Sequence, residues 1–557
     1  MAVSAISPTN MKRKKRTHST ASALVLFAIL GLVLLPFFAL IGIAFSGSVD
    51  AWPHLLANVL PRSIFQTFGL LFLVALGTST IGAGTAWLTS VFEFPLRRIF
   101  TWALVLPLAV PTYIAAYTQL EFFDFSGPVQ TFIRDIGGYQ SLRDYWFPDL
   151  RSLWGASLVF SLVLYPYVYM TTRLTFARHG ATALDACRSL GASPSRMFWK
   201  IGLPMARPAL AAGVALALME TLNDIGAVEI LGVRTLTYAV FETWLNRDDL
   251  VGAVQLALML LIIVAFLVWL ERKARGARNY SATSRERPPA RLQLQGARKW
   301  LAVLSCIAPI GMGLGVPIYV LATYTLRRLD DGFDPALLAA TFNSVVVATV
   351  TALIATALAY GVIQFARLTR NKRVTATGRI ASLGYAVPGT VLAIGLLIPL
   401  AAFDNWFDGV LRSRLGISSG LLLSGTVGIL IYAYVLRFLA ISYGTIESGF
   451  ARVSPHIDLV ARSLGRTPSQ VAKQVHTPIM KTVLASAFLL VFVDTMKELS
   501  ATLLLRPFNF ETLATYIYDH ASQSALEEAA IAALLVVLIG LIPVYLVSRV
   551  PHREGKY

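Results

Sequence analysis

Five ionisable residues lie inside two strongly apolar stretches of this sequence. They are Glu220, Asp224, Asp494, Lys497 and Glu498. An ionised side chain near the centre of a bilayer costs at least about 2.5–3.5 kcal/mol on insertion scales, so such residues usually face a bundle interior or a watery path. Carboxylates are also the oxygen ligands that hard cations prefer. The residue types therefore favour a polar path for a solute through an apolar protein.

The spacing of the acids indicates a duplication. Glu220 is separated from Asp494 by the same interval that separates Asp224 from Glu498 (494 − 220 = 498 − 224). Residues four apart share one face of a helix, so we expect four carboxylates to converge on a shared axis. The alternative is that they pair with Lys497 or with bases elsewhere and only hold helices together. Any metal contact, at Glu220 and Asp494, would be transient, because a conducting path must release what it binds.

The composition is that of a membrane protein. Of the 557 residues, 56% are hydrophobic and 14% are charged, and the mean hydropathy is +0.65. Soluble domains carry roughly 25% charged residues. The two cysteines, Cys187 and Cys306, indicate neither a disulfide framework nor a metal cluster.

Apolar segments of spanning length predict an all-α membrane protein. A span needs about 20 mostly apolar residues, which gives about twelve transmembrane helices. They are placed near 22–45, 64–90, 99–120, 152–172, 207–231, 251–270, 300–324, 341–366, 378–402, 419–442, 481–505 and 526–548. The predicted domains are a basic tail (1–21), a first six-helix domain (22–270), a polar linker (271–299), a second six-helix domain (300–548) and a second tail (549–557). An even number of crossings separates the halves, so they are parallel repeats.

The loop charges predict the orientation. Lys and Arg crowd into the loops on one side, including the linker and the tails, whereas the opposite loops 121–151 and 403–418 hold few bases. By the positive-inside rule both termini lie in the cytoplasm. This distribution accounts for most of the net charge of +18, so binding to nucleic acid loses its main support and the lipid bilayer is the expected partner.

Two polar segments interrupt the halves at matching places. Residues 185–204 read DACRSLGASPSRMFWKIGLP, and residues 459–478 read LVARSLGRTPSQVAKQVHTP. Gly191 and Gly465 are separated by the interval that relates the acids (465 − 191 = 494 − 220). We call these stretches the first and second repeated segments; they lie in the predicted cytoplasmic loops 173–206 and 443–480.

Each repeated segment is expected to form two short helices. The glycine ends the first helix in the left-handed conformation. Ser193 or Thr467 then caps the second helix, with proline at its first position. Pro204 or Pro478 ends that helix before the next span begins.

At these residues the chain resembles the permease subunits of binding-protein-dependent ABC importers. Their signature is Glu-Ala-Ala, three residues, Gly, nine residues and Ile-x-Leu-Pro. The first segment fits it with Asp185-Ala186-Cys187, Gly191 and Ile201-Gly202-Leu203-Pro204, whereas the second begins with Leu459-Val460-Ala461 and keeps Gly465 and Pro478. In the family this element docks into a separate ATPase subunit. The resemblance implies docking residues Asp185, Ala186, Gly191, Leu203, Pro204, Ala461, Gly465 and Pro478. The alternative is a hairpin with only a structural role.

Further stretches are similar to the two-domain permeases of bacterial ferric-iron importers. These are Glu220–Val228, Met496–Phe510 and the run Thr112–Tyr117 before a long external loop. The resemblance implies a type I ABC importer permease fold in the bacterial inner membrane. It also implies that a periplasmic binding protein delivers ferric iron to loops such as 121–151 and 403–418. Thiamine, an oxyanion or a polyamine are alternative substrates for the same architecture.

The chain is not expected to be an enzyme. Gly-Lys occurs only at Gly555-Lys556, followed by Tyr557, so the sequence lacks a phosphate-binding GxxxxGK[ST] loop. We therefore expect no cofactor in this chain, with ATP and Mg bound by a partner ATPase homodimer. A secondary transporter would need no ATPase, and the repeated segments argue against it. A membrane enzyme would need a nucleophile–base arrangement or metal-ligand spacing, and none stands out.

Overall fold

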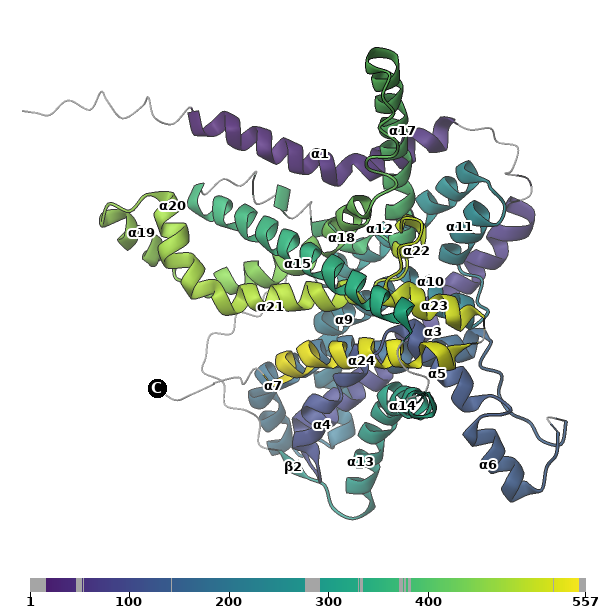
Figure 1. Ribbon diagram of the computed structural model, residues 1–557. Helices are drawn as coiled ribbons and strands as arrows, with labels where there is room; N and C mark the ends of the chain where they lie inside the picture. The colour runs from purple at the N-terminus through teal and green to yellow at the C-terminus, as the bar shows by residue number, and fades with distance from the viewer. Residues whose placement is uncertain are drawn as a thin grey trace, which may run out of the picture.

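The computed structural model describes residues 17–46, 53, 55–141, 143–275, 291–328, 330, 334–369, 374, 377–378, 382–523 and 525–549, with side chains for most of them. The described chain is largely helical, with long helices packed side by side (Figure 1).

The elements up to the linker are α1 (Thr17–Ser46), η1 (Leu55–Val59), α3 (Leu60–Val91), β1 (Phe92–Glu93), α4 (Arg97–Ala103), η2 (Leu106–Ala109), α5 (Thr112–Phe123), α6 (Pro128–Gly137), α7 (Leu153–Ser189), α8 (Pro194–Met197), η3 (Phe198–Gly202), α9 (Leu203–Asn223), α10 (Ile225–Ile230), α11 (Leu236–Leu245) and α12 (Leu250–Arg275).

The elements that follow are β2 (Leu292–Gln293), α13 (Ala297–Ile310), η4 (Gly311–Gly315), α14 (Val316–Arg327), α15 (Pro335–Thr369), η6 (Ser382–Ala386), α17 (Gly389–Leu415), α18 (Val427–Phe450), α19 (Pro455–Ser463), α20 (Pro468–Val471), η7 (Ala472–His476), α21 (Thr477–Met496), α22 (Thr502–Leu505), α23 (Leu513–Ser522) and α24 (Leu526–Arg549).

The fold is that of an all-α multi-pass membrane protein. Within the described residues, ten helices are long and apolar enough to cross a membrane, and an eleventh is counted if one bent pair forms a single span. The predicted first span, 22–45, falls within α1. The apolar part of this helix that the structure describes with side chains, Leu30–Phe45, is shorter than the other spans. The total of twelve therefore remains a prediction.

The third span of the first half is bent. Arg97–Ala109 and Thr112–Gly137 meet at 97°. Val110 is extended because it precedes Pro111, and the helical conformation is disfavoured for a residue that precedes a proline. The second half repeats the break at Pro388, whose φ of −56° and ψ of 139° match −57° and 140° at Pro111.

The first helix of each half packs against the other half. Helix α1 contacts α17, and α14 contacts α5 (Figure 1). Gly395 of α17 lies so close to Pro36 of α1 that an added Cβ would be 2.8 Å from the proline. The sequence repeats are therefore interlocked in space.

One hydrogen bond recurs in both halves and supports the duplication. The amide of Leu236 donates to Thr67 Oγ1 at 2.9 Å, and the amide of Leu513 donates to Ser344 Oγ at 2.7 Å. Donor and acceptor are displaced along the chain by the same interval (513 − 236 = 344 − 67). The two halves therefore make equivalent contacts at equivalent positions.

Two predicted boundaries are wrong. Residues 403–415, expected in an external loop, belong to α17, where the buried Asp404 carboxylate accepts the amides of Leu423 and Ser424 and so ties the following loop to the helix. The predicted span 419–442 begins later, at Val427, and continues to Phe450.

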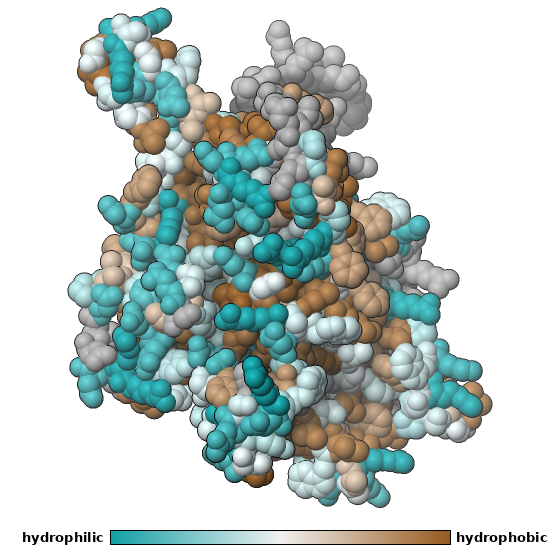
Figure 2. Space-filling model, turned by 90° about the vertical axis from the view of Figure 1, so that its right-hand side faces the viewer, coloured by the Kyte–Doolittle hydropathy of each residue, from teal (hydrophilic) through white to brown (hydrophobic). Residues whose placement is uncertain are grey.

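The two ends of the bundle differ. Helices α19 and α20, from the second repeated segment, lie at one end of α15 and α21, and α11 and α23 lie at the other (Figure 1). Hydrophilic residues are spread over much of the α11 and α23 end, as expected of a surface in contact with water (Figure 2).

Candidate functional site

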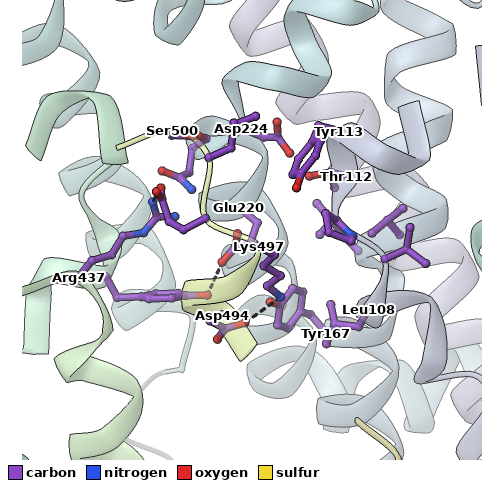
Figure 3. Close-up of a pocket in the computed structure, with 18 of the residues that line it drawn as sticks. Leu108, Thr112, Tyr113, Tyr167, Glu220, Asp224, Arg437, Asp494, Lys497 and Ser500 are labelled. Atoms are coloured by element: carbon purple, nitrogen blue, oxygen red, sulfur yellow. Dashed lines mark hydrogen bonds and ion pairs between the residues drawn. The ribbon is translucent and has the colours of Figure 1, made fainter. Parts of the chain in front are cut away.

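One cavity of about 70 Å³ is lined by all five ionisable residues singled out above: Glu220, Asp224, Asp494, Lys497 and Glu498. Helices α5, α7 and α9 contribute to its wall from the first half, and η6, α18 and α21 contribute from the second. Figure 3 shows Glu220, Asp494 and Lys497 directed toward one another, with Asp224 nearby. The residues related by the repeat interval therefore lie in one cluster.

The expectation that each pair of acids shares one helical face is wrong. Helix α9 ends at Asn223, and Asp224 caps α10, its Oδ1 accepting the amide of Ala227 at 2.8 Å. Helix α21 ends at Met496, and Glu498 accepts the amides of Ala501 and Thr502 at 3.0 and 3.2 Å. Unpaired amides at a new helix start need acceptors, and these carboxylates supply them. The predicted spans 207–231 and 481–505 are thus broken at their acids.

Two of the four acids form ion pairs, as the alternative interpretation expects. Lys497 Nζ lies 2.8 Å from Asp494 Oδ1. Arg437 Nη1 lies 2.5 Å from Glu498 Oε1, and these two side chains are only 6% and 2% exposed. Glu498 also accepts the Thr502 hydroxyl at 2.9 Å. This dense set of contacts gives Glu498 a structural role.

Glu220 and Asp224 differ from the other two acids. Within the described part of the chain, neither has a basic side chain within ion-pair distance, and Glu220 instead accepts a hydrogen bond from the Tyr385 hydroxyl. Four carboxylates and two basic side chains line the cavity, leaving two formal negative charges (−4 + 2), and these fall on the first half.

Sequence reasoning missed several lining residues. Arg437 stands alone as a base in the apolar run of α18, which is a signal that could have identified it. Tyr113, Tyr167 and Tyr385 gave no such signal, since tyrosines are common at the ends of spans. Asn223 joins the halves, because its Oδ1 accepts the Gly389 amide at 2.7 Å and its carbonyl accepts the Ser500 hydroxyl at 2.6 Å.

The cluster is not arranged as a metal centre in this conformation. Among the residues that were described, no group of three His, Cys, Asp or Glu side chains is placed to hold a metal ion. A cation passing here would meet carboxylate and phenol oxygens one or two at a time.

The repeated segments have the predicted local backbone. Gly191 and Gly465 have φ values of +73° and +76°. Ser193 accepts the Arg196 amide, and Thr467 forms a capping box with Gln470. The expected end at Pro204 and Pro478 is wrong: each proline lies in the first turn of α9 or α21, where its missing amide is tolerated, so the helical run continues into the span.

The predicted docking residues lie in different environments. The side chains of Asp185 and Ala186 are outside the described residues. Leu203 and Pro204 are half-buried, Ala461 is buried, and Gly191, Gly465 and Pro478 are exposed. The neighbouring Leu190 and Leu464, which correspond in the two repeats, are 85% and 74% exposed, so they present matching apolar contacts that the site prediction omitted.

The residues that pack against the two repeated segments differ between the halves. In the first half the Trp87 ring packs against Phe176 and Phe198, with ring centroids 5.3 Å apart in both pairs. Gly202 makes room for that ring, since an added Cβ would be 2.7 Å from Trp87 Cζ3. Linker strand β2 also pairs in parallel with β1 in this half.

The second half has a polar network at the corresponding positions. Gln364 corresponds to Trp87 (364 − 87 = 513 − 236), and His476 corresponds to Gly202 (476 − 202 = 494 − 220). His476, fully buried, contacts Gln364 through Nδ1 and Asp458 Oδ1 through Nε2 at 2.6 Å. Arg367 Nε donates to Asp458 Oδ2 at 2.8 Å. Burial alone would raise the pKa of Asp458, but hydrogen bonds from Arg367 and His476 outweigh it and hold this pKa below its ordinary value. The network ties α19 to α15 and to η7, which leads into α21.

Part of the chain matches a known protein family, and several known proteins are similar to it. Residues 79–275 match the family described as binding-protein-dependent transport system inner membrane component. The chain is 26% identical to the Fe(3+)-transport system permease protein FbpB 2 of Haemophilus influenzae over 489 residues, which is 87% of this chain and 89% of that protein. It is 23% identical to the probable ABC transporter permease protein y4fN of Sinorhizobium fredii, covering 86% of this chain and 85% of that one. It is 25% identical to a probable sulfate transport system permease protein of Chlorokybus atmophyticus, covering 47% of this chain and 95% of that one.

Proposed function

We propose that this chain is an inner-membrane permease of a binding-protein-dependent ABC importer and that ferric iron is the solute it moves, a proposal supported by the matched family and the similar proteins. The observation that carries the proposal is a pair of acids in a cavity between the halves, Glu220 and Asp224, with no basic side chain of the described residues at ion-pair distance. Their charge favours a cation, and their oxygen atoms suit a hard one.

The size of the cavity also supports an ion. About 70 Å³ is room for roughly five water molecules by the same measure. An ion with part of its hydration shell fits such a space, whereas thiamine or an extended polyamine does not fit the cavity in this conformation.

An oxyanion is the second candidate, because a sulfate permease is among the similar proteins. An anion would need free basic groups in the path. Both basic side chains of the cavity are already engaged, Arg437 with Glu498 and Lys497 with Asp494. The relative named for ferric iron also covers 87% of the chain, against 47% for this sulfate relative. Ferric iron is therefore preferred.

The proposed partners follow from the class of importer. An ATPase homodimer would dock on the repeated segments at the cytoplasmic face, with Leu190 and Leu464 as apolar contacts. A periplasmic binding protein would deliver the ion at the α11 and α23 end. Closure of the ATPases would reach the cavity through α9 and α21, which run from the repeated segments to Glu220 and Asp494. Coupling of this kind is reciprocal, so a loaded binding protein should also change the ATPase rate.

Uptake by the whole complex tests the proposal. The permease, its ATPase and its binding protein are reconstituted in vesicles, and uptake of labelled ferric iron and of labelled sulfate is measured. The double variant E220Q/D224N should lower iron uptake at least about tenfold, equivalent to about 1.4 kcal/mol of barrier. The control E93Q, at an acid outside the cavity and outside the proposed docking surfaces that pairs with Arg97 at 3.0 Å, should not. Sulfate uptake by the native complex, or full iron uptake by the double variant, would overturn the assignment.

A further inference from the structure

A second cavity, of about 370 Å³, lies beside the acidic one. Most of its lining is apolar, with Leu216, Ile441, Leu490 and Val493 among the lining residues. Leu216 precedes Glu220 on α9, and Leu490 precedes Asp494 on α21, so this cavity is nearer the repeated segments than the acidic cavity is. The two spaces thus follow one another along the proposed path.

The wall between the cavities is a defined set of side chains. Five residues line both spaces, and we call them the septum: Leu108, Tyr167, Tyr385, Asp494 and Lys497. Figure 3 shows Leu108, Tyr167, Asp494 and Lys497 of this set grouped below Glu220. A solute that passes from one cavity to the other must displace these side chains.

The septum is assembled from both halves. Tyr167 belongs to α7 in the first half, and its hydroxyl interacts with Tyr385 of η6 in the second. Tyr385 in turn donates a hydrogen bond to Glu220 of α9. Leu108 and Tyr385 are separated by the interval that relates the two proline breaks (385 − 108 = 388 − 111), so they are corresponding positions of the two repeats. Separating the halves would therefore break the septum along its middle.

Lys497 is the one basic member of the septum. Its ammonium group is held by Asp494 at 2.8 Å, on the segment where α21 has just ended. This ion pair, neutral overall, stands between an acidic cavity, which attracts cations, and an apolar cavity, which disfavours them.

We propose that Lys497 acts as a tethered cation that closes the path to small cations while no substrate is bound. Glu220 and Asp224, which form no ion pair among the described side chains, would otherwise admit the abundant monovalent cations as well as the substrate. The ammonium occupies the place beside Asp494 that such an ion would have to take, and it neutralises the carboxylate that would otherwise bind the ion. Displacement of Lys497 accompanies the separation of the halves, when the septum opens to pass the substrate. This inference rests on the permease role but not on the identity of the solute.

Leakage of K⁺ tests the inference without any transported substrate. The complex is reconstituted in K⁺-loaded vesicles, and K⁺ efflux is followed by an electrode in the absence of ATP and binding protein. K497M should raise efflux at least about tenfold above the native complex. K497R, which keeps the charge, should remain tight, and so should K481M, the same substitution at an exposed position nearer the start of α21. An iron-uptake defect without leakage would overturn the inference while leaving the proposed function intact.

Charge rescue within one folded protein removes the question of misfolding. Cys187 and Cys306 are first replaced by Ser or Ala, so that K497C carries the only thiol of the chain. K497C vesicles should leak, and 2-aminoethyl methanethiosulfonate, which attaches an ammonium group through a disulfide, should reseal them. A neutral methyl reagent should leave the leak unchanged. Leakage that persists with the ammonium reagent would refute the role of the charge. Leakage that ceases equally with the neutral reagent would show that side-chain bulk closes the path.

Discussion

Replacing Glu498 with glutamine should destabilise the protein strongly, because this carboxylate holds together two parts of the second half. Its Oε1 accepts Arg437 Nη1 at 2.5 Å and the Ala501 amide at 3.0 Å, and its Oε2 accepts the Thr502 amide at 3.2 Å and the Thr502 hydroxyl at 2.9 Å. A glutamine keeps one acceptor oxygen and turns the other into a donor. In either orientation, two donors lose their acceptor and Arg437 loses its counter-charge.

The magnitude follows from burial. Breaking a buried ion pair by removing one partner costs about 3–5 kcal/mol, because the remaining charge is left uncompensated. With side-chain exposures of 6% and 2%, the Arg437–Glu498 pair belongs to that class. A partly exposed pair is worth at most about 1 kcal/mol. The Arg506–Asp519 pair, at 3.0 Å and with exposures of 27% and 31%, supplies a control in the same half.

The assay is equilibrium unfolding in mixed micelles with a denaturing detergent, applied to E498Q, R437M, the double variant and D519N. We expect each single variant at the buried pair to lose about 3–5 kcal/mol, and D519N to lose about 1 kcal/mol or less. The double variant should lose less than the sum of the singles, with a coupling of up to about 3 kcal/mol. Additive losses, or a cost for E498Q no larger than for D519N, would refute the structural assignment of Glu498.

Three further predictions concern other parts of the fold. In G191V or G465V the valine must adopt a left-handed backbone, at a cost of about 1–2 kcal/mol. Either variant should uncouple ATP hydrolysis from uptake, and unchanged transport in reconstituted vesicles would exclude the docking role. The pKa of Asp458 is lowered in the folded protein, so its stabilising contribution is present above the ordinary aspartate pKa, about 3.9, and is lost as the pH falls through the lowered value. In acid unfolding, D458N should therefore lose less stability with falling pH than the native chain. Identical profiles would contradict this. G226V should cost about 1–3 kcal/mol by overpacking, since even a Cβ would be 2.7 Å from Leu499 Cδ2, and micelle unfolding equal to the native protein would show that the neighbouring side chains can yield.

The duplication and the acidic cluster were predictable because both are written in residue type and spacing. An ionised residue within the membrane is costly, so its presence in an apolar stretch indicates a polar interior or a watery path. The helix breaks beside Pro111 and Pro388 repeat one local rule, and the caps at Ser193 and Thr467 are set by residues within a single turn. Interactions of this range are encoded by neighbours in the chain.

The break within the fifth span of each half was not predictable in the same way. Asp224 reads as part of a continuous apolar helix, yet it caps a new one. The chain leaves the helix there because Asn223 is held by Gly389 and Ser500 from the other half. Contacts between residues so far apart in the sequence leave no periodic trace.

The sequence alone thus determined an all-helical membrane protein with a repeated polar segment and a set of intramembrane charges. Only the tertiary structure divided those charges into two roles. Glu498 and Asp494 lie beside bases and are neutralised, whereas Glu220 and Asp224 are left facing the cavity. The physical reason is distance: an ion pair depends on a few ångströms between side chains, and those distances are set by how separate helices pack. The same packing decided that Tyr167 and Tyr385 meet at a septum, although they belong to opposite halves of the chain.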